Sequence, residues 1–194
     1  MSQISTVCVY CGASAGLRPS VRAAAAGLAR EIVGAGCRLV YGGGRVGLMG
    51  ILADAALAAN GHVTGIIPAH IQEKEVQHTG LSELLVVDSM HTRKRMMVER
   101  SDAFAVLPGG IGTLDEFVEI VTWRQLGLHD KPIVLVDLDD YWRQLLELME
   151  QMEAMGFLRP TDSLLFERVE TVADVMPTLR HAAAPARPTR VDQA

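Results

Sequence analysis

Residues 103–116 read Ala-Phe-Ala-Val-Leu-Pro-Gly-Gly-Ile-Gly-Thr-Leu-Asp-Glu, an apolar run that ends in a proline and a glycine-rich turn. The pattern predicts a buried strand, a tight loop and the start of a helix. Glycines in such a loop let the backbone turn sharply and come close to a ligand. The first amide groups of a helix have no partner within it and carry partial positive charge, so this turn suits a phosphate group.

The start of that helix also offers a purely structural interpretation of two polar residues. Thr113 and Glu116 have the spacing of a capping box, in which each side chain bonds to the backbone of the other residue. We therefore expect the helix to run from about Thr113 to Leu126. On spacing alone, capping is the alternative to any chemical role for Glu116.

Apolar runs and helical segments alternate along the rest of the chain. Continuous apolar strands are typical of parallel sheets that are buried on both faces. The expected fold class is therefore α/β, a Rossmann-like doubly wound parallel sheet flanked by helices in a single domain. We expect strands at residues 6–10, 38–41, 62–67, 84–87, 103–107, 133–136 and 165–169. We expect helices at residues 19–35, 48–60, 89–100, 113–126, 140–155 and 172–181.

Two other segments lack these patterns. Residues 69–82 are polar and without period, which predicts an irregular loop. Residues 182–194 contain two prolines and little apolar content, which predicts a disordered tail after a single Rossmann-like domain at 1–181.

Composition restricts the possible partners. The 194 residues carry a net charge of −5, which argues against a general nucleic-acid binder because neutralising phosphates requires a basic surface. We expect no membrane contact either, since the sequence has neither a signal peptide nor a bilayer-length apolar run. With three cysteines in all, a reducing cytoplasmic location is expected.

Candidate redox, metal and dinucleotide motifs are weak. Cys8 and Cys11 form a C-x-x-C pair, but Cys8 lies inside a predicted strand, which favours core packing. The six histidines are scattered, so we predict no metal site. Gly42, Gly44 and Gly47 match a dinucleotide fingerprint, yet no acidic residue ends the next strand. A close-packing or mononucleotide loop is favoured, and no cofactor is predicted.

The segment from Met90 to Met97 is a basic helix with three consecutive cations at 93–95. The ordinary interpretation is a solvated face, with Arg95 and Glu99 as an i,i+4 ion pair. However, cations at the start of a helix oppose its dipole, and this helix begins at the carboxyl end of a strand. An anion bound nearby is therefore the alternative.

Three motifs together resemble one family. They are Tyr-Gly-Gly-Gly at 41–44 with Gly-Leu-Met-Gly at 47–50, Met-His-x-Arg-Lys at 90–94, and Pro-Gly-Gly-x-Gly-Thr-x-x-Glu at 108–116. The chain is similar to the cytokinin riboside 5′-monophosphate phosphoribohydrolases, the "lonely guy" or LOG family, from about Val7 to Leu179. The resemblance implies a homodimer that hydrolyses the N-glycosidic bond of a nucleoside 5′-monophosphate, such as AMP or its N6-prenylated form. Members have also been labelled lysine decarboxylases, for which these residues give no physical basis.

The resemblance also implies which residues act. Arg93 and Glu116 correspond to the catalytic pair of the family. The implied substrate-binding residues are Glu75, Arg93, Lys94, Gly110, Ile111, Gly112, Thr113, Leu114, Asp115, Glu116 and Thr122. A carboxylate at 116 could stabilise the positive charge that develops on the sugar and accept a proton from the attacking water.

Two other functions are compatible with the same loop. Relatives of this fold act as molybdenum-cofactor carriers, so a non-catalytic nucleotide- or molybdenum-cofactor-binding protein is the main alternative to the enzyme. NADP-dependent reduction is weakened by the missing ribose-binding residue after the third strand. The helix from Val118 to Leu126 is a candidate dimer contact, with Trp123 either exposed there or buried in the core.

Overall fold

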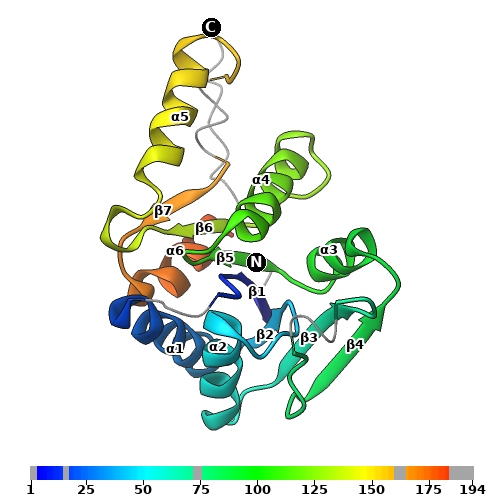
Figure 1. The fold of residues 1–194 in the computed structure, drawn as a ribbon. Coiled ribbons are helices and arrows are strands. Elements are labelled where there is room, and N and C mark those ends of the chain that lie inside the picture. The colour runs from blue at the N-terminus through cyan, green and yellow to red at the C-terminus, as the bar shows by residue number, and fades with distance from the viewer. Residues whose placement is uncertain (1–3, 15–17, 72–75, 160–164, 184–194) are drawn as a thin grey trace, which may run out of the picture.

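The computed structural model describes residues 4–14, 18–71, 76–159 and 165–183 (Figure 1). They form one seven-stranded sheet in the order β4-β3-β2-β1-β5-β6-β7, and each neighbouring pair is parallel. The strands are β1 (Thr6–Tyr10), β2 (Arg38–Tyr41), β3 (Val63–Pro68), β4 (Glu83–Val87), β5 (Ala103–Val106), β6 (Ile133–Val136) and β7 (Glu167–Val169).

Helices follow the strands on both sides of this sheet. They are α1 (Pro19–Gly34), α2 (Gly47–Ala58), α3 (Met90–Glu99), α4 (Ile111–Gln125), α5 (Arg143–Ala154) and α6 (Val175–Ala182). Short 3-10 turns precede two of them, η1 (Leu138–Asp140) before α5 and η3 (Val172–Asp174) before α6.

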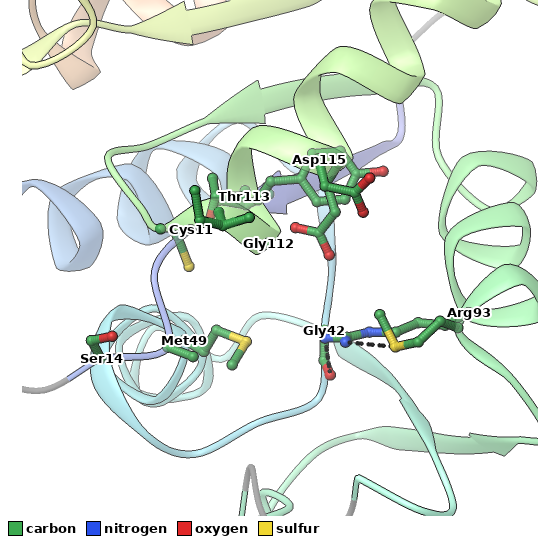
Figure 2. A pocket seen from close by; sticks show the side chains of 15 residues that line it. Cys11, Ser14, Gly42, Met49, Arg93, Gly112, Thr113 and Asp115 are labelled. Atoms are coloured by element: carbon green, nitrogen blue, oxygen red, sulfur yellow. Dashed lines mark hydrogen bonds between the residues drawn. The ribbon is translucent and has the colours of Figure 1, made fainter.

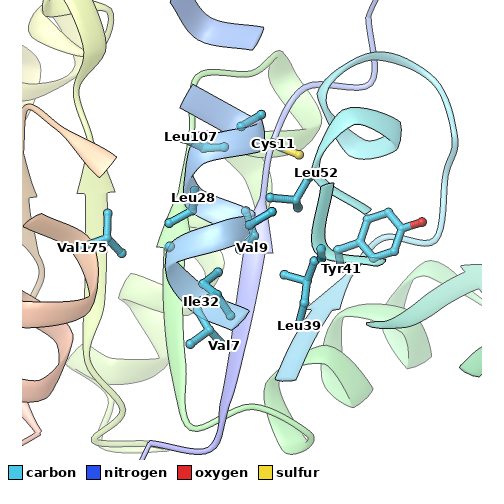
Figure 3. Close-up of a cluster of buried hydrophobic side chains, with 14 of the residues drawn as sticks. Val7, Val9, Cys11, Leu28, Ile32, Leu39, Tyr41, Leu52, Leu107 and Val175 are labelled. Atoms are coloured by element: carbon cyan, nitrogen blue, oxygen red, sulfur yellow. The ribbon is translucent and has the colours of Figure 1, made fainter. Parts of the chain in front are cut away.

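The side chains of β1 divide between two hydrophobic clusters. Val7 and Val9 pack with residues of α1, α2 and α6 on one face of the sheet (Figure 3). Cys8 and Tyr10 pack with residues of α3 and α4 on the other face. Because successive residues of a strand point to opposite faces, this alternation means that the central strand is buried on both sides. The predicted Rossmann-like doubly wound sheet is confirmed.

Most predicted elements lie within a few residues of the observed ones. The strands at 6–10, 38–41 and 133–136 have the predicted bounds. Two helices were predicted to begin too early, because the chain first forms the turns η1 and η3 before α5 and α6. Helix α6 includes Ala182, one residue beyond the predicted end of the helix at 181, so the tail was predicted to begin at least one residue too early; residues 184–194 lie outside the described part of the chain.

The cysteine prediction is also confirmed. Cys8 and Cys11 are both buried and both are free thiols, Cys8 in the core beneath α3 and α4 and Cys11 in the cluster beneath α1 and α2. Among the described residues, none of the helices has the length and apolar character needed to cross a bilayer.

The sheet order fixes where a ligand can bind. The chain winds from β1 to β2, β3 and β4 in one direction, and then returns to β5 on the opposite side of β1. Connections therefore diverge at the carboxyl ends of β1 and β5, which opens a crevice between the loops that follow them. Residues 11–14 and 107–110 form the described parts of these two loops.

Candidate active site

A cavity of about 290 Å³ lies at this crevice. Its walls come from β1 and the loop after it, the glycine at the end of β2, helices α2 and α3, and the first turns of α4. Figure 2 shows Arg93 extending from α3 toward Gly42, with Gly112 and Thr113 of α4 on the opposite side. The loop at 108–116 and the basic helix, which are far apart in the sequence, are thus brought to one site.

Helix α4 begins three residues earlier than the capping box requires. Its first helical residue is Ile111 and its N-cap is Gly110, so Thr113 already lies inside the first turn. In the part of the chain that the structure describes, no side chain caps this helix. The capping-box interpretation is wrong, because an extended glycine can end the loop and start the helix at once. Glu116 instead lines the cavity, one turn further along α4.

Tight packing explains the first glycine of the loop, Gly109. A Cβ atom on Gly109 would lie 2.1 Å from Oγ1 of Thr113 and 2.9 Å from the backbone nitrogen of Gly12. Thr113 is buried and lines the cavity together with Gly110, Ile111 and Gly112. The loop is therefore packed against the segment that follows β1, with the first residues of α4 at the cavity wall, where amide groups favour an anion.

The guanidinium group of Arg93 occupies space that only glycine leaves at position 42. Arg93 is 4% exposed, and its Nη2 donates a hydrogen bond of 3.0 Å to the carbonyl oxygen of Gly42. A Cβ atom on Gly42 would lie 2.0 Å from that nitrogen. The close-packing interpretation of the glycine motif at 42–47 is confirmed at this position.

The three consecutive cations of α3 have different environments. Arg95 is exposed and lies 3.9 Å from Glu99, as expected for a solvated i,i+4 pair. Arg93 and Lys94 are buried, so the solvated-face interpretation is wrong for both. Since burying a cation is unfavourable unless it is compensated, these two side chains must have polar or charged neighbours.

Lys94 is compensated by carboxylates of α4 at the edge of the site. Its Nζ lies 3.1 Å from Asp115 and 3.0 Å from Glu119. Burial acts to lower the pKa of Lys94, but hydrogen bonds and charge from Glu119 and Asp115 outweigh it and raise the pKa above its ordinary value. Lys94 therefore stays charged and joins α3 to α4 directly beside Arg93 and Glu116.

The thiol of Cys11 and the carboxylate of Glu116 line the same cavity, and the carboxylate affects the pKa of the thiol. Burial raises the pKa of the Cys11 thiol, and the negative charge of Glu116 raises it further. Burial and then Glu116 also raise the pKa of Cys8. Because the thiolate is the nucleophilic form, Cys11 is inert although it lines the cavity. The cavity therefore offers carboxylate chemistry rather than thiolate chemistry.

The remaining predicted site residues lie in different places. Among the described residues, Leu114 packs against the core, and neither it nor Thr122 lines the cavity. Among the described residues, Lys94 does not line the cavity and pairs with Asp115, which does. Glu75 lies outside the described residues.

Several cavity residues were missed by the sequence analysis. The signals available for Met49 and Met90 were their places in the motifs at 47–50 and 90–94. The missed lining residues are Val9, Tyr10, Cys11, Ala13, Ser14, Met49 and Met90. Gly42, which also lines the cavity, had been predicted to belong to a close-packing or mononucleotide loop. Within the described residues, no three His, Cys, Asp or Glu side chains are grouped as a metal site requires.

Comparisons with known proteins agree with this geometry. A family model described as "Possible lysine decarboxylase" matches residues 49–179. A cytokinin riboside 5′-monophosphate phosphoribohydrolase of Rhodococcoides fascians is 49% identical over 156 residues, which cover 80% of this chain and 79% of that protein. LOG5 of Arabidopsis thaliana, named for the same activity, is 44% identical over 165 residues, covering 85% and 72%. The chain belongs to the LOG family.

The fold of this LOG-family chain is shared more widely. The solved molybdenum cofactor carrier protein of Chlamydomonas reinhardtii superposes with a TM-score of 0.71, over 93% of this chain and 98% of that one. The two are 18% identical, so this likeness concerns the fold alone.

Proposed function

We propose that the protein hydrolyses the N-glycosidic bond of nucleoside 5′-monophosphates, cytokinin riboside 5′-monophosphate and/or AMP, to give the free base and ribose 5-phosphate. The observation that carries this proposal is the presence of buried Arg93 and of Glu116 in one cavity, beside the start of α4. The activity named for the similar proteins of R. fascians and A. thaliana supports the same reaction.

The 5′-phosphate is assigned to the start of α4. Gly110, Ile111, Gly112 and Thr113 line the cavity there, and the helix begins without a side-chain cap in the described part of the chain. Amide groups of a first helical turn donate hydrogen bonds to an anion, and the helix dipole adds to the attraction.

Arg93 supplies the positive charge of the site. Its guanidinium group is held in one orientation by the carbonyl of Gly42. A planar, permanently charged group fixed in this way can bind a nucleotide oxygen through two donors. Its charge also favours the ionised form of a nearby carboxylate, which is the form that Glu116 needs for its role.

Glu116 is assigned the chemical step. As the C–N bond breaks, positive charge develops on the ribose and negative charge on the base. The carboxylate stabilises the charged sugar and accepts a proton from the water whose oxygen attacks the anomeric carbon. The departing base leaves with the bonding electron pair and takes up a proton.

Asp115, Lys94, Glu75 and Thr122 are the other residues proposed to act in substrate binding. Asp115 lies at the cavity wall, where it can reach the ligand, although it also pairs with Lys94. We propose that Lys94 acts on the substrate through this pairing. Glu75 and Thr122 are kept as substrate-binding predictions from the family resemblance.

Release of free base separates hydrolysis from a carrier function. Incubation of the purified protein with AMP should release adenine, detected by chromatography, together with an equal amount of ribose 5-phosphate. The variant Glu116→Gln should bind AMP and release adenine at least a hundredfold more slowly. If the unmodified protein binds AMP but releases neither adenine from AMP nor N6-prenyladenine from N6-prenylated AMP, the protein is a nucleotide-binding or carrier protein.

We infer that the protein forms a homodimer. In Figure 1, α5 extends away from the sheet, and its described residues are all at least partly exposed. Leu148, Met152, Met155 and Phe157 are exposed on or just after it. A helix with this much apolar surface needs a partner, and a second copy of the chain offers an identical helix.

Helix α4 is a second part of this predicted surface. Val118 is 48% exposed and Leu126 is 66% exposed, whereas Trp123 is half-buried and packs against the core. Analytical ultracentrifugation should give twice the mass of the chain. The variant Met152→Glu should shift the equilibrium toward monomer, whereas a wild-type protein that sediments as a monomer would contradict the inference.

The cytoplasmic location is likewise proposed. The thiols of Cys8, Cys11 and Cys37 are all free, which is typical of a reducing compartment.

A further inference from the structure

The peptide group between Gly109 and Gly110 separates two cavities. Gly110 lines both the candidate active site and a second cavity of about 530 Å³, which Gly109 and Tyr141 also line. The hydroxyl of Tyr141 donates a hydrogen bond to the carbonyl oxygen of Gly109 on the side of the second cavity. Tyr141 is thus bonded to the loop at 107–110 on the side that faces the second cavity rather than the active site.

This hydrogen bond fixes the direction of the next amide group. The peptide bonds of the described residues are trans, so a carbonyl and the N–H that follows it point in opposite directions. With the carbonyl of Gly109 directed at Tyr141, the N–H of Gly110 is directed away from Tyr141, and Gly110 itself lines the active-site cavity. The preceding carbonyl, that of Pro108, accepts a hydrogen bond of 3.2 Å from the backbone of Gly12.

Tyr141 follows a strained turn that neighbouring charges hold in place. Asp139 and Asp140 both have φ of 54°, a region that residues other than glycine rarely occupy. Arg168 lies 2.8 Å from buried Asp137 and 3.1 Å from Asp140, so it joins the two ends of this turn. Strain that the surroundings maintain is often found where a side chain must be placed for function.

Contacts other than the hydroxyl hydrogen bond hold the aromatic ring of Tyr141 in place. It packs edge to face on Trp142, with ring centroids 4.8 Å apart. The backbone nitrogen of Trp142 donates a 2.7 Å hydrogen bond to Asp137. Loss of the hydroxyl alone would therefore leave the ring and the turn in place.

We propose that Tyr141 is a positioning residue for phosphate binding: its hydroxyl sets the Gly109–Gly110 peptide so that the Gly110 amide faces the 5′-phosphate. This inference rests on the proposed function, because it assigns the phosphate to that loop. It concerns the anion specifically, and predicts no effect on ligands that lack the phosphate.

The test is Tyr141→Phe, with Ser20→Ala as the matched control. Ser20 donates a 3.2 Å hydrogen bond to Asp139 of the same turn, and within the described residues it has no hydrogen bond to the loop at 107–110. Loss of one hydrogen bond should raise the dissociation constant for ribose 5-phosphate, measured by calorimetry, and the KM for AMP by about fivefold to tenfold. The kcat, the inhibition constant of adenosine and the melting temperature should stay near their wild-type values, and Ser20→Ala should change none of them.

Three results would overturn the inference. The first is a dissociation constant for ribose 5-phosphate within twofold of wild type in Tyr141→Phe. The second is a loss of adenosine affinity in Tyr141→Phe that equals its loss of ribose 5-phosphate affinity. The third is a loss of ribose 5-phosphate affinity in Ser20→Ala that equals the loss in Tyr141→Phe. Either of these two results would indicate that Tyr141 has a general structural role. If the wild-type protein releases no adenine while Tyr141→Phe still weakens ribose 5-phosphate binding selectively, the inference holds and the proposed hydrolysis fails.

Discussion

Replacing Gly42 by alanine should disturb the proposed catalytic pair without unfolding the protein. The added Cβ would lie 2.0 Å from Nη2 and 3.1 Å from Cζ of Arg93, and 3.2 Å from the sulfur of Met49. Carbon and nitrogen atoms in contact are normally separated by about 3.5 Å, so the guanidinium group must move by more than about 1 Å. Its 3.0 Å hydrogen bond to the Gly42 carbonyl is then broken or strained.

The effects on stability and activity should differ in size. The clashing atoms are at the flexible end of Arg93, so the fold can absorb the methyl group by moving that side chain. Loss of a hydrogen bond to a charged group lowers the free energy of unfolding by roughly 1.5–3 kcal/mol at most. A catalytic group displaced by about 1 Å can lose roughly a hundredfold in rate. We therefore expect kcat/KM for AMP to fall about a hundredfold in a protein that remains folded at 25 °C.

The measurement is adenine release at several AMP concentrations, together with urea unfolding. Gly34→Ala is the matched control, because it adds the same methyl group where no atom lies within 4 Å. That variant should keep full activity, and its free energy of unfolding should rise by up to about 1 kcal/mol because Gly34 lies in helix α1, where alanine is preferred to glycine. Activity of Gly42→Ala within threefold of wild type would refute the argument that Arg93 must be held at this position.

Three further variants test the other groups of the site. Glu116→Gln should lower kcat by roughly 10²–10⁴ while the melting temperature changes little, since Glu116 is not a helix cap; near-normal turnover would contradict its catalytic role. Lys94→Met should lower the free energy of unfolding most below about pH 10, where an ordinary lysine amine is charged, and this loss should vanish as pH rises through the raised pKa of Lys94. If urea unfolding gives the same loss of free energy at pH 7 and at pH 12, the pairing of Lys94 with Asp115 and Glu119 is refuted. Cys11→Ala should keep kcat within a few-fold of wild type, because burial and Glu116 hold the pKa of that thiol high, and a large loss would indicate a chemical role for sulfur.

The sheet could be predicted from the sequence because its signals are local. Thr6–Tyr10 is a continuous apolar run followed by a glycine-rich turn, and the same pattern recurs along the chain. The start of α4 could not be predicted in this way. Thr113 has the same spacing to Glu116 whether it caps the helix or lies inside it, and only the extended backbone of Gly110 decides between them.

The parts of the site that sequence reasoning missed depend on long-range contacts. Lys94 finds its partners on a helix that begins 17 positions further along the chain, at Ile111. The space for Arg93 is set by Gly42, which follows β2 and lies 51 positions before Arg93 in the sequence. Likewise, the left-handed backbone at Asp139 and Asp140 has no signal in a sequence that contains no glycine there. The catalytic pair is proposed from the family resemblance, and the structure adds the hydrogen bond that holds Arg93 in place.

The most direct test of the central claim is a crystal structure of the Glu116→Gln variant with AMP bound. The account predicts that the phosphate accepts hydrogen bonds from the backbone amides of Gly110–Thr113, with Arg93 on the nucleotide and the side chain at position 116 beside the anomeric carbon. A phosphate bound anywhere else on the molecule, or a ribose turned away from position 116, would contradict it.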